Sequence, residues 1–110
     1  MQSWQVSEIE APAGTRDPAV LETADGARAV ALVLSPGQAL GEHEVRERAW
    51  VAVLEGTARV EAAGQTVDGG PGTLFTFAPH ERHSISSEGG ARILLLLVPW
   101  PGEGHYPEPS

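Results

Sequence analysis

Turn-forming residues divide this chain of 110 residues into short segments of similar length. Glycine (13 residues) and proline (9 residues) provide most of the breaks. They recur at intervals of about 8 to 12 residues, the spacing expected of an all-β sandwich or barrel. The breaks lie at residues 12–14, 25–26, 36–37, 55–56, 64, 69–72, 79 and 89–90. Because these breaks interrupt every long helical apolar period, the sequence predicts an all-β fold with almost no helix.

The segments between the turns are rich in residues that favour β-strands. Predicted strands cover residues 19–23, 28–34, 50–54, 58–62, 73–77, 83–86 and 92–98. Three stretches, 29–34, 50–54 and 93–98, are apolar at nearly every position, which predicts strands covered on both faces and places Trp50 in the core. One face would meet the barrel interior, and the other a second sheet, a terminal arm or another subunit. An apolar excess of this kind predicts a homodimer.

The length fits one domain with three parts. Residues 1–27 are expected to form an N-terminal arm with strands joined to the barrel, in which residues 4–9 are an arm or an edge strand. Residues 28–98 form the barrel core. Residues 99–110 form a proline-rich tail, because prolines lack the N–H donor that strand pairing needs. Trp100 in this tail could still pack against the barrel or a neighbour.

Charge and composition exclude several classes of partner. The formal charge is −8, with 15 acidic residues and no lysine, so nucleic acid and anionic membrane surfaces are not expected partners. Cysteine is absent, which excludes disulfides and thiolate chemistry. No signal peptide or membrane-spanning stretch is apparent, so we expect a cytoplasmic protein. The lack of lysine and asparagine beside abundant arginine and alanine indicates a bacterial source.

Two glycine-punctuated segments each contain a histidine at a corresponding place. The first runs from Gly37 through His43 to Gly56, and the second from Gly72 through His83. Together they resemble the two conserved motifs of the cupin superfamily. In that pattern Val45 stands at the second histidine position and Ala49 at the glutamate position. In the second motif Ala78, His80 and Ser87 stand where proline, glycine and asparagine are usual. Of the four metal ligands of the pattern, two are therefore present, His43 and His83.

The resemblance implies a cupin-type double-stranded β-helix, a jelly-roll (RmlC-like) barrel. It also implies a divalent transition metal as a candidate cofactor, Zn, Mn, Fe or Ni, bound by His43 and His83. Glu47 and His80 are the leading candidates for a further ligand, beside Glu42 and Glu44. Glu47 lies at an even spacing from His43 and would share its face if the strand stayed regular. The alternative is that both histidines are ordinary polar groups of the barrel mouth.

The same resemblance places a pocket inside the barrel. We expect it to be lined by His43, Val45, Ala49, Val51, Phe77, His83 and Ile85. Replacement of two ligands by Val45 and Ala49 favours the binding of a small organic molecule. The leading hypothesis is therefore a small stand-alone cupin that binds such a molecule, with or without a weakly held metal. The alternatives are a metal-dependent enzyme of dioxygenase or isomerase type, and an interaction or sensor module that acts as a dimer.

Overall fold

The computed structural model describes residues 1–9 and 19–102, and within these ranges the chain is almost entirely β-structure. One short 3-10 turn, η1 (Val6–Glu8), precedes the strands. The strands are β1 (Ala19–Ala24), β2 (Ala27–Leu34), β3 (Gln38–His43), β4 (Arg48–Gly56), β5 (Ala58–Ala62), β6 (Gln65–Gly69), β7 (Leu74–Phe77), β8 (His83–Ser87) and β9 (Ala91–Val98). The predicted all-β class is confirmed. No described helix is long and apolar enough to cross a membrane.

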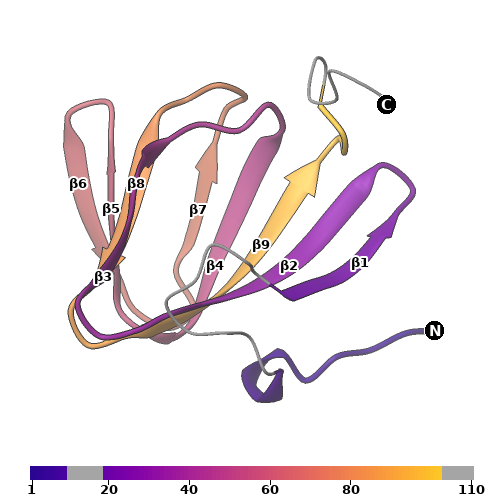
Figure 1. Ribbon diagram of the computed structural model, residues 1–110, viewed down its shortest axis with the longest axis horizontal. Helices are drawn as coiled ribbons and strands as arrows, with labels where there is room; N and C mark the ends of the chain where they lie inside the picture. The colour runs from indigo at the N-terminus through magenta and orange to yellow at the C-terminus, as the bar shows by residue number, and fades with distance from the viewer. Residues whose placement is uncertain (10–18, 103–110) are drawn as a thin grey trace.

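The strands form two antiparallel sheets that face each other (Figure 1). One sheet has five strands in the order β1-β2-β9-β4-β7, and the other has four in the order β3-β8-β5-β6. The chain passes repeatedly from one sheet to the other, as in a jelly roll. Strand β1 pairs with β2, so the five-stranded sheet begins within the segment that we expected to be the N-terminal arm. Residues 10–18 of that arm and residues 103–110 of the predicted tail lie outside the described residues.

The sequence prediction missed two strands. Strand β3 has only two apolar residues, Ala39 and Leu40, followed by Gly41, and β6 is exposed at four of its five positions, so neither shows an alternating apolar pattern. Both become strands through pairing, β3 with β8 and β6 with β5. Of the two alternatives for residues 4–9, an arm or an edge strand, the structure shows no strand there, because the backbone turns into η1. Arg92 donates hydrogen bonds to the carbonyls of Val6 and Ile9 and holds this turn against β9.

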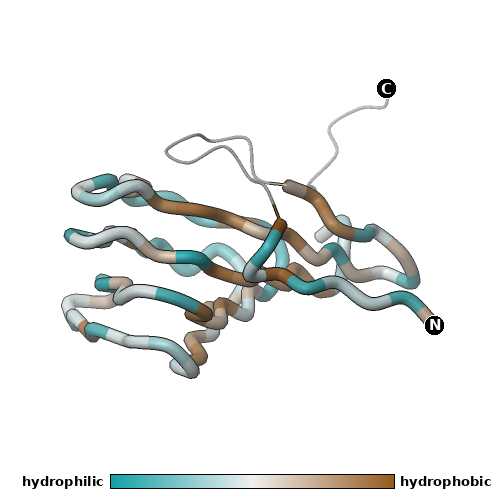
Figure 2. Tube along the Cα trace, turned by 90° about the horizontal axis from the view of Figure 1, so that it is seen from below, coloured by the Kyte–Doolittle hydropathy of each residue, from teal (hydrophilic) through white to brown (hydrophobic). Residues whose placement is uncertain are grey.

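The core lies between the two sheets, and its buried apolar residues come from β2, β4, β5, β7, β8 and β9. Figure 2 shows the hydrophobic stretches of the chain in brown among hydrophilic ones in teal. The most buried members of the core include Leu34, Val51, Val53 and Ile93. The outer face of the five-stranded sheet is not fully covered in the single chain. Trp50, which we predicted to be in the core, lies on this outer face and is 37% exposed, because its neighbours in β4 take the inward positions.

The two ends of the barrel differ. We call the end at which β3 finishes and β8 starts the histidine end, because it contains His43 and His83. At the opposite end the chain leaves β4 for β5 through Gly56, which has a positive φ of 77°. A Cβ at Gly56 would overlap the carbonyl oxygen of Gly90, so only glycine fits this crossing between the sheets.

Candidate functional site

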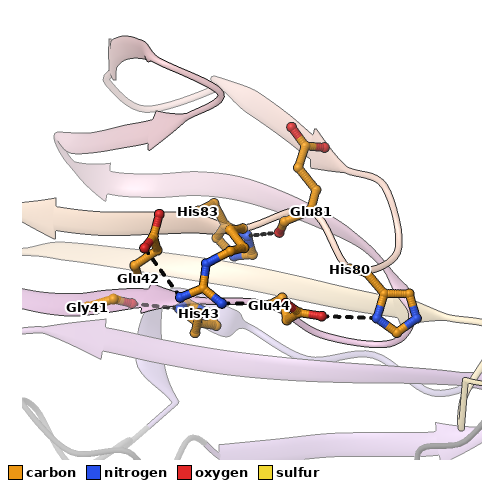
Figure 3. A network of polar contacts seen from close by, with 8 residues as sticks. Gly41, Glu42, His43, Glu44, His80, Glu81 and His83 are labelled. Atoms are coloured by element: carbon orange, nitrogen blue, oxygen red, sulfur yellow. Dashed lines mark hydrogen bonds and ion pairs between the residues drawn. The ribbon is translucent and has the colours of Figure 1, made fainter.

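The two predicted histidines lie side by side at the histidine end. Strands β3 and β8 pair so that His43 and His83 are opposite each other, after a register shift between Leu40 and His43. Their ring centroids are 4.4 Å apart, and the rings are tilted by 58° (Figure 3). His83 is almost completely buried, whereas His43 is half-buried. Pairing of neighbouring strands therefore joins two motifs that are far apart in the sequence.

Each imidazole is oriented by a backbone carbonyl. Nδ1 of His43 lies 2.8 Å from the oxygen of Gly41, and Nδ1 of His83 lies 3.0 Å from the oxygen of Glu81. A carbonyl oxygen only accepts hydrogen bonds, so Nδ1 is assigned as the protonated nitrogen in both rings. In the neutral form, Nε2 of each ring then has a lone pair. The pair therefore offers two hydrogen-bond acceptors or two metal ligands.

The surroundings of His83 favour its neutral form. Burial lowers the pKa of His83 below its ordinary value of 6.5, the bond to the Glu81 carbonyl raises it in part, and the neighbouring His43 lowers it further. Phe77, buried on β7, stacks on the ring with centroids 3.9 Å apart and an angle of 5°. We expected Phe77 to line the pocket. It is not among the cavity-lining residues, because its ring covers one face of the His83 imidazole instead.

A small apolar cavity adjoins the histidine pair. Its volume is about 40 Å³, and it is lined by Leu32, Leu40, His43, Val45, Ala49, Val51, His83, Ile85, Ile93, Leu95 and Leu97. Every predicted pocket residue except Phe77 lines it. A water molecule occupies about 30 Å³ in the liquid, whereas pockets for drug-sized ligands measure roughly 300–1,000 Å³. The side chains thus fill most of the barrel interior.

The two residues proposed as further metal ligands do not join the pair. Strand β3 ends at His43 and β4 starts at Arg48, so the regular spacing that would place Glu47 beside His43 is lost in the connecting loop. Glu47 is fully buried, and its Oε2 accepts a hydrogen bond of 2.8 Å from the N–H of Gly102. His80 lies in the exposed β7–β8 loop, where its Nδ1 is 3.0 Å from Glu44.

Residues 1–9 and 19–102 contain no group of three His, Asp or Glu side chains that could hold a metal ion. A catalytic zinc site, for comparison, usually has three protein ligands. The residues present therefore fit a loosely bound ion held by two imidazoles, and they do not fit a complete catalytic metal centre.

An exposed ion-pair network connects the two loops beside the histidines, a feature that the sequence analysis did not identify (Figure 3). Arg82 lies 3.3 Å from Glu42 and 3.6 Å from Glu44, and Glu44 also contacts His80. The sequence signals this network only by the opposite charges of Arg82 and of Glu42 and Glu44, which lie about 40 residues apart. Exposed ion pairs contribute little to stability, so this network mainly sets the polarity of the rim.

Sequence comparison places the chain in a family. Residues 32–103, more than half of the chain, match the family described as the AraC-like ligand binding domain. This protein belongs to that family. Its domains are cupin-type, so the resemblance noted from the two histidine motifs is confirmed. No curated protein matches the sequence.

Solved structures show that this cupin has the double-stranded β-helix fold. A conserved protein with a double-stranded β-helix domain from Klebsiella pneumoniae is 18% identical, with a TM-score of 0.79 over 93% of both chains. A cupin superfamily protein from Desulfitobacterium hafniense is 21% identical, with a TM-score of 0.76 over 86% of both chains. A protein of unknown function from Rhizobium leguminosarum is 24% identical, with a TM-score of 0.78 over 90% of this chain and 97% of that one.

A second hollow of this cupin lies outside the barrel. It measures about 620 Å³, is open to solvent, and extends over β3, β8, β5 and β6. Ser84, Ile85 and Ser86 line it beside Glu61, and of the three β8 residues Ile85 is buried in the core. The hollow is wide and shallow, and no buried charged side chain lines it. The barrel cavity therefore remains the better candidate site.

Proposed function

We propose that this cupin binds a small, largely apolar organic molecule inside the barrel, with His43 and His83 accepting hydrogen bonds from its polar end. The supporting observation is the pair of Nδ1–carbonyl bonds, which leave a lone pair on Nε2 of two rings that line an otherwise apolar cavity. The ligand-binding character of the family agrees with this proposal.

The chemistry of the pair limits the ligand to a hydrogen-bond donor. A neutral imidazole with Nδ1 occupied can only accept at Nε2, so a hydroxyl or N–H group suits it and a carboxylate does not. The acidic net charge and the carboxylates of Glu42 and Glu44 at the rim also disfavour an anion. A neutral molecule with a donor group and an apolar body has the required properties. A phenol is the simplest probe, and its single O–H can donate to one of the two imidazoles at a time.

The cavity must enlarge to admit such a molecule. Leu40, Val45 and Leu95 line it and are only partly buried, so these side chains can move with less loss of packing than the core residues around them. The volume of the cavity with a molecule bound would then be larger than the 40 Å³ of the free cavity. Enlargement of this kind favours molecules of a few heavy atoms over large ligands.

A metal-dependent enzyme, of dioxygenase or isomerase type, is the second candidate. It is favoured by one observation: metal-ligating histidines usually donate their other ring N–H to a carbonyl or carboxylate, as both rings do here. A bound ion would act as a Lewis acid. However, the absence of a three-ligand group among the described residues supports a weak site over a catalytic centre.

Imidazole NMR with two matched probes tests the two candidates. Phenol should shift the ring signals of His43 and His83 in the wild-type protein, and benzene, which lacks the donor, should bind about tenfold more weakly. The His43→Leu/His83→Leu variant should lose this preference for phenol. Zn²⁺ is titrated in parallel. Binding of one Zn²⁺ per chain that depends on both histidines, with no response to phenol, would replace the organic-ligand proposal by the metal candidate.

We further propose that two copies of this cupin associate through the outer face of the five-stranded sheet. Trp50 of β4 pairs with Leu96 of β9, and Ala52 pairs with Leu74 of β7, so these side chains form one continuous patch. Val98 extends the patch beyond Leu96. Because the chain is acidic, two copies repel each other over most of their surface. The patch residues named here include no carboxylate, so two copies can approach each other most easily through it.

A further inference from the structure

The segment that follows β9, residues 99–102, lies at the histidine end of the barrel; we call it the strap. Its first anchor is Trp100. The backbone N–H of Trp100 donates a hydrogen bond of 2.7 Å to the carbonyl of Gly26 in the β1–β2 turn. The guanidinium of Arg28 lies 3.9 Å from the centre of the indole ring, and the ring packs against the hydrophobic core. The strap is thereby fixed to β2 on one side.

The second anchor is Glu47, in the loop between β3 and β4. Its buried carboxylate accepts the N–H of Gly102 at 2.8 Å. Gly102 is itself buried against Arg46, and a Cβ there would lie 2.6 Å from the Arg46 carbonyl oxygen. A charge-assisted hydrogen bond and a close fit that only glycine permits therefore seat the end of the strap.

The strap packs against the residues that enclose the histidine cavity. Trp100 lies against the core cluster, and members of this cluster, Ala49, Val51 and Leu97 among them, line the cavity. Burial of a carboxylate is costly unless it is compensated, and an apolar side chain would fill the same space without that cost. The hydrogen bond between Glu47 and Gly102 can break and re-form in water. Such a contact is better suited to a movable cover than to permanent packing.

We propose that the strap is a hinged cover of the histidine cavity, that Glu47 is its latch, and that molecules reach His43 and His83 when the latch opens. The small cavity of this structure is then the latched state. Opening separates Gly102 from Glu47 and lifts Trp100 from the core. The proposal concerns access to the two imidazoles, and it holds whichever molecule or ion the cavity binds.

The latch is tested in protein whose only tryptophan is Trp100, made with Trp4→Phe and Trp50→Phe. Gly102→Ala should unseat the strap and raise acrylamide quenching of Trp100 severalfold. Gly89→Ala is the matched control, because a Cβ there meets nothing within 4 Å and its φ is not positive. Glu47→Gln keeps an acceptor but removes the charge, so it should give a smaller increase. Equal quenching in Gly102→Ala, Glu47→Gln and Gly89→Ala would overturn the latch.

Access is measured independently of any ligand, by the rate at which diethylpyrocarbonate modifies each histidine. In Gly102→Ala, buried His83 should react about tenfold faster than in the Gly89→Ala control, the ratio expected for loss of one charge-assisted hydrogen bond. Exposed His80 should react equally in both. Urea unfolding of each variant separates opening from loss of fold, and Glu47→Gln replaces Gly102→Ala if the latter does not fold. Faster quenching of Trp100 with an unchanged His83 rate would overturn the role as a cover.

Discussion

At the level of single residues, the chemistry of the cavity depends on hydrogen bonds made outside it. The carbonyls of Gly41 and Glu81 each hold an imidazole Nδ1, and this fixes Nε2 as the reactive nitrogen of both rings. Phe77 restrains the His83 ring by stacking. The residues that define the site are therefore partly backbone groups, and changes in their neighbours would alter the pair without touching it.

The lowered pKa of His83 predicts how stability depends on pH. Burial favours the neutral ring in the folded state, whereas the unfolded ring gains its proton below about pH 6.5. Between this value and the lower folded-state pKa, the unfolded chain binds more protons, so stability is present above about pH 6.5 and falls as the pH decreases. Urea midpoints measured between pH 7.5 and pH 5 should fall less in His83→Gln than in the wild type. Equal falls would contradict the assignment.

The sequence placed the residues of the cavity wall better than it placed the proposed further metal ligands. His43, Val45, Ala49, Val51, His83 and Ile85 line the cavity. The resemblance to the cupin motifs pointed to these positions, and all except Val45 lie on strands, where the side-chain direction alternates regularly. Glu47 and His80 lie in loops, where spacing does not determine direction, and they bind Gly102 and Glu44 instead. The stacking of Phe77 on His83 depends on a contact between the two sheets, and the ion pairs of Arg82 with Glu42 and Glu44 depend on the pairing of β3 with β8.

At the level of elements, the barrel depends on where strands cross between the sheets. The passage from β4 to β5 at Gly56 is the tightest, because the backbone of Gly90 lies against it. Turn residues in the sequence marked this crossing and most strand ends. Strands β3 and β6 were not predicted, because their side chains carry no apolar pattern. Their strand character comes from pairing, with the distant β8 in the case of β3 and with the preceding β5 in the case of β6.

Two glycine variants separate close packing from backbone conformation at such a crossing. Gly56 and Gly64 have the same positive φ of 77°, but a Cβ at Gly64 meets nothing within 4 Å. Gly64→Ala should therefore cost about 1 kcal/mol of unfolding free energy, from the left-handed conformation alone. Gly56→Ala must also displace the Gly90 backbone and should cost about 3 kcal/mol or more. Urea denaturation measures both, and equal losses would show that the crossing is not tightly packed.

At the level of the whole molecule, the outer face of the five-stranded sheet is the feature that the single chain does not explain. The apolar runs of β4 and β9 predicted strands covered on both faces, yet Trp50 and Leu96 are 37% and 38% exposed. A second copy of the chain would cover both residues. The homodimer stays a proposal, and it concerns a surface on the opposite side of the sheet from the histidine cavity.

Matched charge substitutions test this proposed dimer. Trp50→Glu puts a carboxylate into the outer patch, so two copies would bury unpaired charges and repel each other. Val67→Glu is the control, because Val67 is a 48% exposed apolar residue of β6, in the other sheet. Sedimentation velocity should show two-chain particles for the wild type and Val67→Glu, and single chains for Trp50→Glu with unchanged circular dichroism. A wild-type protein that sediments as a single chain at all concentrations would refute the dimer, and a Trp50→Glu protein that still pairs would place the interface elsewhere.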